Sequence, residues 1–225
     1  KKKQSLKECQ HKWKFICDDD RYNYKECESC GRKSKESRLA TIAGYNEPNP
    51  QKKKEINEWL SENRYIRGKA VVLDAKGLKT SRKLVESREF KVSDIIIPEY
   101  DADMYDENSK DKEFGMCLRN GDYLDILKGV KPSELSFIYA DFTGSYEKWV
   151  KPLLNYLKRV KHELMDGLIV GLTWSNNGVG TASVRSKISR EMGKYSSVLE
   201  LEEIEGSPTE NGYGMGGNMN VIFYR

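Results

Sequence analysis

At 225 residues, with 33% of them charged and a mean hydropathy of −0.76, the chain is long enough to bury a core and too polar for an integral membrane protein. No apolar run approaches the roughly 20 residues that span a bilayer, so we predict no membrane partner. The chain opens with Lys1–Lys3 and polar sequence rather than an apolar stretch, and we expect no secretory signal. These features predict a soluble protein of an intracellular, reducing compartment, the cytoplasm or the nucleus.

The net charge of +4 is distributed unevenly along the chain. Residues 1–54 contain 15 Lys and Arg against 8 Asp and Glu, a balance of +7, so the remainder carries −3. A basic segment beside a nearly neutral one predicts that the front of the chain meets phosphate or another acidic surface. The alternative is that these charges only keep the segment in solution.

Four of the five cysteines lie within the first thirty residues. Cys27 and Cys30 form a C-x-x-C motif, whose spacing lets two thiolates bind one tetrahedral Zn²⁺. Cys17 is the alternative ligand, or a small buried apolar residue. Four protein ligands leave no position for water, so the predicted zinc is structural rather than catalytic. The predicted ligands are Cys9, His11, Cys27 and Cys30.

The pattern C-x-H-x-W…C-x-x-C-G over these residues resembles small zinc ribbons of viral and phage proteins. That resemblance implies a zinc module at residues 1–48, of which residues 34–48 are interpreted as a linker. For a viral protein, the intracellular compartment would be that of the host cell. A segment this short and polar is expected to fold only with its metal.

The stretch Ala70–Val85 is the centre of the remaining chain. A short apolar, β-branched run predicts a buried strand that stops at Asp74. A turn containing Gly77 follows, and Thr80 or Ser81 offers an N-cap hydroxyl for the next helix. A strand, an acid, a glycine turn and a helix N-terminus are the usual elements of a nucleotide-type cofactor site.

Three later predicted strands also end at an acidic residue. Since the carboxyl ends of parallel strands meet at one edge of a sheet, these acids predict one pocket. The alternative is that each acid only caps its own strand or turn. The pairs are strand 95–97 with Glu99, strand 114–119 with Asp122, and strand 135–142 with Asp141.

Helices are predicted before and between these strands. The first covers residues 49–67 and begins at Asn49-Pro50, an N-cap and N1 pair. Its first turn carries Lys52–Lys54, where the helix dipole disfavours cations, so another group is expected to need those charges. The last predicted elements are a helix over 149–160, a strand over 168–174, a basic helix over 181–194, and a hairpin of strands 198–205 and 220–224. We therefore predict an α/β fold with a mostly parallel, doubly wound sheet and an antiparallel C-terminal hairpin.

This order of elements, from Arg67 to Arg225, resembles the class I S-adenosylmethionine-dependent methyltransferases, which have a Rossmann-like sheet. The resemblance implies S-adenosylmethionine as cofactor and a methyltransferase-type domain at residues 49–225. The family usually shows G-x-G after the first acid, whereas this loop has a single glycine. The implied cofactor-binding residues are Asp74, Gly77, Thr80, Glu99, Asp122 and Asp141, and the implied catalytic residue is Asp141.

Two functions follow as the leading hypotheses. The first is a methyltransferase that acts on nucleic acid, with the zinc module for docking and the basic helix at 185–190 as a second contact. In that helix, Arg185, Lys187 and Arg190 could equally form a solvated face. The second is a catalytically inactive, methyltransferase-like protein that binds nucleic acid or serves assembly. A protein methyltransferase is a third alternative.

Overall fold

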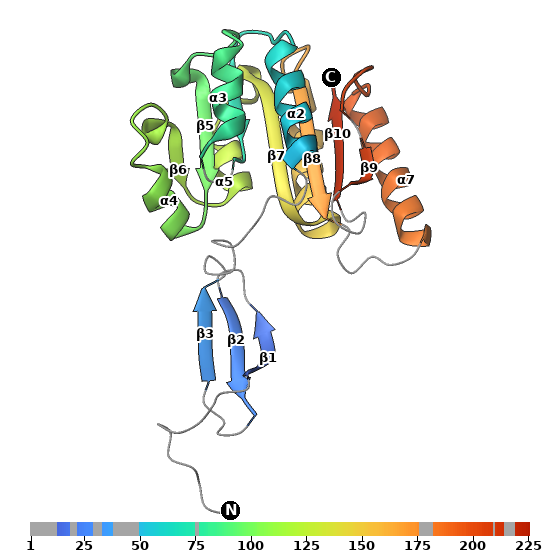
Figure 1. Ribbon diagram of the computed structural model, residues 1–225. Helices are drawn as coiled ribbons and strands as arrows, with labels where there is room; N and C mark the ends of the chain where they lie inside the picture. The colour runs from blue at the N-terminus through green and yellow to red at the C-terminus, as the bar shows by residue number, and fades with distance from the viewer. Residues whose placement is uncertain are drawn as a thin grey trace, which may run out of the picture. The chain divides into compact units, whose positions relative to one another are not determined.

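The computed structural model describes residues 13–18, 22–28, 33–37, 50–74, 77–175, 182–208, 210–213 and 219–225 (Figure 1). The chain divides into two compact units, Lys1–Pro48 and Asn49–Arg225. Each unit is described by itself below.

The first unit contains a three-stranded antiparallel sheet in the order β1-β2-β3. Within it, Trp13 of β1 pairs with Cys27 of β2. The third strand was predicted as linker, and that prediction was wrong for residues 34–37, because pairing with β2 sets its structure and its polar sequence carries no apolar signal. The strands are β1 (Trp13–Asp18), β2 (Tyr22–Cys27) and β3 (Lys33–Ser37).

The second unit is built on a seven-stranded sheet in the order β6-β5-β4-β7-β8-β10-β9. Pairing is parallel from β6 to β8, and β10 is antiparallel to both of its neighbours. The predicted mostly parallel sheet with a C-terminal antiparallel hairpin is therefore confirmed. The strands are β4 (Lys69–Val72), β5 (Ile95–Glu99), β6 (Leu118–Asn120), β7 (Leu135–Ser145), β8 (Ile169–Ser175), β9 (Glu210–Tyr213) and β10 (Met219–Tyr224).

Helices cover both faces of this sheet, and each face has its own apolar core. In β7, Phe137 and Tyr139 pack on one face while Ile138 and Ala140 pack on the other, as strand alternation requires. The first face is covered by α2 (Pro50–Glu62), α3 (Lys79–Glu86) and α4 (Ala102–Asn108), and the second by α5 (Tyr123–Lys128), α6 (Lys151–Val160) and α7 (Ala182–Leu199) (Figure 1).

Short helical turns complete the connections between these elements. A π-helical turn, Tyr146–Val150, joins β7 to α6. The 3₁₀ turns are Val92–Asp94, Gly115–Cys117, Pro132–Glu134 and Lys161–Glu163.

Several predicted boundaries were wrong, and the hairpin partner was misplaced. The predicted strand 198–205 is the end of α7 followed by a loop that makes one isolated bridge, between Glu203 and Tyr224. The hairpin partner of β10 is β9, which lies in a segment whose glycines and polar residues give no strand pattern. The predicted third strand contracts to Leu118–Asn120, since Gly115–Cys117 forms a 3₁₀ turn.

Within the residues given above, no helix has the combination of length and apolar content that a bilayer crossing requires.

Candidate functional site

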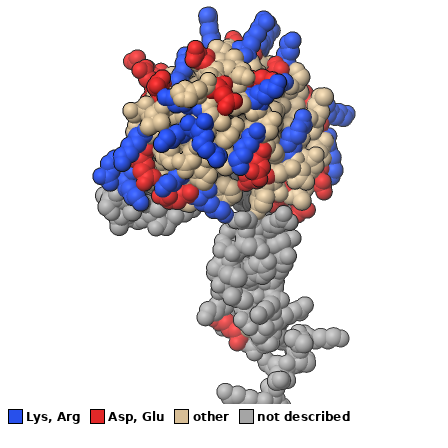
Figure 2. Space-filling model, turned by 180° about the vertical axis from the view of Figure 1, so that it is seen from behind, with Lys and Arg blue, Asp and Glu red and all other residues tan. Residues whose placement is uncertain are grey.

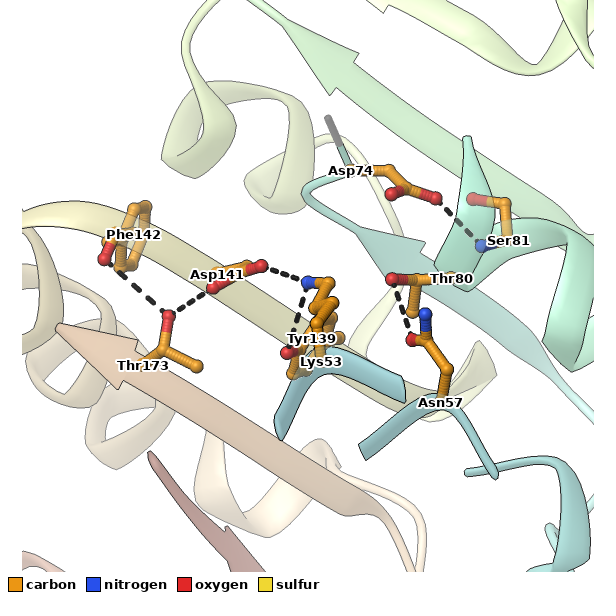
Figure 3. Close-up of polar contacts among 9 residues, drawn as sticks. All are labelled: Lys53, Asn57, Asp74, Thr80, Ser81, Tyr139, Asp141, Phe142 and Thr173. Carbon is orange, nitrogen blue, oxygen red and sulfur yellow. Dashed lines mark hydrogen bonds and ion pairs between the residues drawn. The ribbon is translucent and has the colours of Figure 1, made fainter. Parts of the chain in front are cut away.

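The carboxyl edge of the sheet carries a partly buried ion pair that links α2 to β7. Lys53, in the first turn of α2, pairs through Nζ with the Asp141 carboxylate (Figure 3). The same ammonium donates to the Tyr139 hydroxyl at 3.5 Å and lies 5.0 Å from the centre of that ring. Thr173 Oγ1 donates to Asp141 Oδ1 at 2.5 Å, so both oxygens of this carboxylate have partners.

The charge on Lys53 is stabilised by its surroundings. Burial alone would lower the pKa of Lys53, but the carboxylate of Asp141, with smaller effects from Tyr139 and Asp74, raises it well above its usual value. Lys53 is therefore a fixed cation, with the Asp141 carboxylate as its partner. This contact explains how a lysine is accommodated where the helix dipole disfavours it.

Asp74 lies in the same region and caps helix α3, although it is seven residues before the Ser81 N–H that it accepts from. It follows β4, is 6% exposed, and its Oδ2 accepts a hydrogen bond from the backbone N–H of Ser81 at 2.7 Å (Figure 3). Burial raises the pKa of Asp74, while the Lys53 charge and the Ser81 amide lower it in part. Asp74 thus satisfies an N–H at the start of α3 that no helical carbonyl can reach.

The predicted N-cap role of Thr80 or Ser81 was wrong. Helix α3 begins at Lys79, its N-cap position is Leu78 with φ 51°, and no side chain caps it locally. The Thr80 hydroxyl donates instead to Asn57 Oδ1 of α2 at 3.1 Å (Figure 3). Lys53 and Asn57, one helical turn apart on α2, therefore both face this edge.

Gly77 adopts a backbone conformation that favours glycine. Its φ is +86°, and a Cβ at this position would meet no atom within 4 Å. Strain in the backbone, rather than lack of space, is what disfavours other residues here. The neighbouring residues 75 and 76 lie outside the described chain.

Glu99 and Asp122 form a second group on the same edge. Gly121 N donates to the Glu99 carbonyl at 3.0 Å, which ties the loops after β5 and β6 together. The Glu99 carboxylate accepts from Asp101 N at 2.9 Å, and burial raises its pKa to about 7. Asp122 is exposed and caps α5, accepting from Leu124 N at 2.8 Å.

Beside Asp122 the surface has a hollow of about 140 Å³ with aromatic walls. Phe142 and Trp149 stack with their ring centres 5.6 Å apart at an interplanar angle of 22°, and Lys148 Nζ lies 4.6 Å from the Trp149 ring centre. Trp149 packs so closely on Gly144 that a Cβ there would clash with the indole. The hollow is lined by Asp122, Tyr123, Leu124, Phe142, Lys148, Trp149, Pro152 and Leu153.

Sequence reasoning missed this hollow and the ion pair. It assigned Trp149 to the apolar face of a helix, although a Trp at the very start of that pattern, five residues after Gly144, was the available signal. It noted the lysines of α2 without finding their partner.

The structure groups the predicted site residues unevenly. Asp74 and Asp141 share the neighbourhood of Lys53, while Glu99 and Asp122 are joined through Gly121. Of the predicted zinc ligands, Cys27 is buried at the end of β2, and Cys9, His11 and Cys30 fall outside the described residues. Among the side chains that the structure does describe, no group of three or more His, Cys, Asp or Glu is placed to hold a metal.

No protein-family model matches the chain, and no curated protein matches it in sequence. Solved structures share its fold, among them the two that follow. TYW2 from M. jannaschii, in complex with AdoMet, is 11% identical, with a TM-score of 0.50 over 94% of this chain and 88% of its own. Cofactor-bound Rv0187 from MTB is 14% identical, with a TM-score of 0.51 over 83% and 86%.

Identities this low establish a common architecture and nothing beyond it. The strand order and these likenesses are consistent with a Rossmann-like methyltransferase fold for the second unit, which is the fold that the sequence predicted.

Proposed function

We propose that residues 49–225 bind S-adenosylmethionine and transfer its methyl group to an acceptor in nucleic acid. The observation that carries the proposal is the aromatic hollow lined by Asp122, whose loop is tied to Glu99 through Gly121, on the edge of the sheet where ligands of such folds bind. The likeness in fold to a protein solved with AdoMet supports the same ligand.

Four groups at this edge of the sheet have a role in this proposal. Glu99 accepts hydrogen bonds from the ribose hydroxyls of the donor, for which a carboxylate at the end of the second strand is suited. Asp122 accepts from the amino group of the adenine, and the Phe142–Trp149 stack gives the base an apolar wall. Gly77 lets the backbone turn at the site without side-chain interference.

Asp141 acts in this proposal as a positioning carboxylate. The transfer forms a bond from the acceptor nucleophile to the methyl carbon and breaks the bond from that carbon to sulfur, so alignment supplies most of the rate. Lys53 and Thr173 fix the orientation of Asp141, which lets it align an acceptor N–H or O–H without rotating. Asp141 lies four residues before the end of β7 at Ser145, although the sequence predicted that this strand ends at Asp141, next to the transferred methyl.

Calorimetry with S-adenosylmethionine tests the donor site. We expect binding to the wild type, at least tenfold weaker binding to Glu99→Gln, and no detectable binding to Asp122→Ala. Asp122→Asn is the matched control for the fold, because Asn is as good an N-cap as Asp, whereas Ala costs the cap about 1 kcal/mol. No binding to the wild type at millimolar donor would reject the proposal.

For the first unit, we propose a structural zinc site formed by Cys9, His11, Cys27 and Cys30 that helps to dock the nucleic acid. The register of β1 and β2 supports this set, since Trp13 pairs with Cys27 and His11 precedes Trp13 by only two residues. Cys17 pairs with Tyr24 instead, three residues further along β2 from the Cys27 end. The soft donors and their spacing suit Zn²⁺.

Metal analysis of the purified chain tests this site. We expect one zinc per chain, lost in Cys27→Ser and retained in Cys17→Ser. Retention of zinc in Cys27→Ser, or its loss in Cys17→Ser alone, would contradict the ligand set. Thiolate ligands require a reducing compartment, so this proposal also supports the predicted intracellular location.

The second candidate is a methyltransferase-like protein that binds nucleic acid without a donor. It is favoured by the Lys53–Asp141 pair, which occupies the methyl-proximal carboxylate with a group of the protein itself, and by the single glycine in the loop after Asp74. Nucleic-acid binding by a wild type that binds no donor would select this candidate.

A further inference from the structure

Helices α6 and α7 carry a concentration of positive charge within a unit that is neutral as a whole. Residues 49–225 contain 27 Lys and Arg and 27 Asp and Glu. Segments 146–163 and 186–199, which hold α6, its flanking turns and most of α7, contain 8 Lys and Arg against 3 Asp and Glu. Segment 99–113 has the opposite balance, with 2 Lys against 7 Asp and Glu. The charge is therefore segregated between two sides of the unit.

Five cations on α6 and α7 are exposed to solvent. None of them has an ion pair within the part of the chain that the structure describes, whereas Lys151 is paired with Glu147 and Glu191. Figure 2 views the side of α5, α6 and α7 and shows Lys and Arg spread across it, with small groups of Asp and Glu between them. The five are Lys158, Arg159, Lys187, Arg190 and Lys194.

The two helices form one continuous surface. Tyr195 of α7 donates to Asn155 Oδ1 of α6 at 2.6 Å, and Lys151 Nζ lies 3.5 Å from Glu191 Oε2. Both helices start at the carboxyl edge of the sheet and run the same way, because each follows a parallel strand. At 1.5 Å per residue, the stretch of α7 from Lys187 to its end covers about 18 Å, roughly the length of three nucleotides of an extended strand.

This surface lacks what a protein or membrane partner requires. Protein interfaces have an apolar or aromatic centre, and membrane-surface helices insert apolar side chains. The described residues expose two large apolar side chains, Met116 outside this surface and Val198 at the far end of α7. Cations in series without apolar contacts fit a phosphate backbone.

We propose that a nucleic-acid strand lies along α6 and α7, with its phosphates on the five cations, and reaches the carboxyl edge beside Trp149. The acidic segment 99–113 repels the strand from the opposite side and so orients it. The track deepens the function proposed above by naming how the polymer approaches, but binding to it does not depend on donor binding.

Charge reversal in the full-length chain tests the track. Fluorescence anisotropy with a labelled single-stranded RNA and the same DNA sequence, over a series of salt concentrations, compares Lys187→Glu/Arg190→Glu with Lys110→Glu/Lys112→Glu. The control pair is exposed, has no ion pair among the described residues and makes the same change in net charge on the acidic side. We expect the α7 variant to bind at least tenfold more weakly, with a slope of log affinity against log salt reduced by about 1.4, and the control to change less than threefold.

Three results would overturn the track. Equal losses in both variants would mean that net charge alone governs binding, and no loss in the α7 variant would mean that the first unit binds the polymer by itself. Polyglutamate that displaces the RNA as effectively as unlabelled RNA would show a surface for acidic polypeptides. Donor calorimetry on the wild type and the α7 variant separates the two proposals. If neither protein binds donor and the α7 variant still binds nucleic acid more weakly, the track is supported and the enzyme is rejected.

Discussion

The acidic residues at the two ends of the carboxyl edge differ in where their hydrogen-bond partners lie along the chain. At the α2 end, Asp74 and Asp141 are bonded to groups of the protein, Ser81 N for one and Lys53 with Thr173 for the other. At the α5 end, Glu99 and Asp122 each accept from the backbone N–H group two residues further along the chain, and Asp122 lines an aromatic hollow.

This difference indicates which carboxylates stabilise the fold and which keep hydrogen-bonding capacity for a ligand. A buried carboxylate without partners is costly, so acids on the closed side must be satisfied by the protein itself. A carboxylate on the rim of a hollow keeps lone pairs for a ligand while it caps a turn. The following changes test this division, in order of decreasing effect.

Lys53→Met should have the largest effect, on the closed end. It leaves the partly buried Asp141 and the buried Asp74 without their cation, which costs about 3 kcal/mol of unfolding free energy. Lys54→Met, one residue along α2, removes only an exposed pair with Glu58 and should cost less than about 0.5 kcal/mol. Urea unfolding measures both, and equal losses would mean that the Lys53–Asp141 pair does not hold α2 to the sheet.

Trp149→Ala should act on the open end. Loss of the stacking wall is expected to weaken donor binding by about 1–3 kcal/mol, the usual value of one aromatic–base stack. Calorimetry with S-adenosylmethionine and with adenosine measures it, and both ligands should lose the same factor because they share the base. A loss confined to S-adenosylmethionine would place the adenine elsewhere.

Donor affinity should depend on pH through Glu99. Its pKa of about 7 in the free protein means that it takes up a proton below neutrality, and the donor must then compete with that proton. If the bound carboxylate stays ionised, affinity at pH 6 should be about tenfold lower than at pH 8. Glu99→Gln should remove this dependence, and a wild type with flat affinity over the range would show that Glu99 does not contact the donor.

Gly77→Ala should have the smallest effect. The positive φ costs a Cβ about 1 kcal/mol, and no neighbouring atom adds a clash. Gly144→Ala is the contrast, since its Cβ meets the Trp149 indole and should disturb the aromatic hollow as well as stability. Unfolding and donor calorimetry on both variants separate backbone strain from damage to the hollow.

Local patterns in the sequence were sufficient for the frame of the second unit. Buried β-branched runs predicted β4, β5, β7 and β8 because each strand is covered on both faces and must be apolar throughout. The acids at the strand ends were visible for the same reason, as the first polar residues after each run. Pro50 at the start of α2 was predicted from its fixed φ.

The tertiary structure alone decided what these residues contact. Lys53 and Asp141 lie 88 positions apart and Thr173 another 32, so no periodicity connects them. The hollow forms between Asp122, which follows β6, and Trp149, which precedes α6. These two residues come together because the chain crosses the sheet between β6 and β7. The sequence by itself determined the strands and their acids through local burial, whereas the division into acids that hold α2 and acids left for a ligand arose from contacts between distant segments.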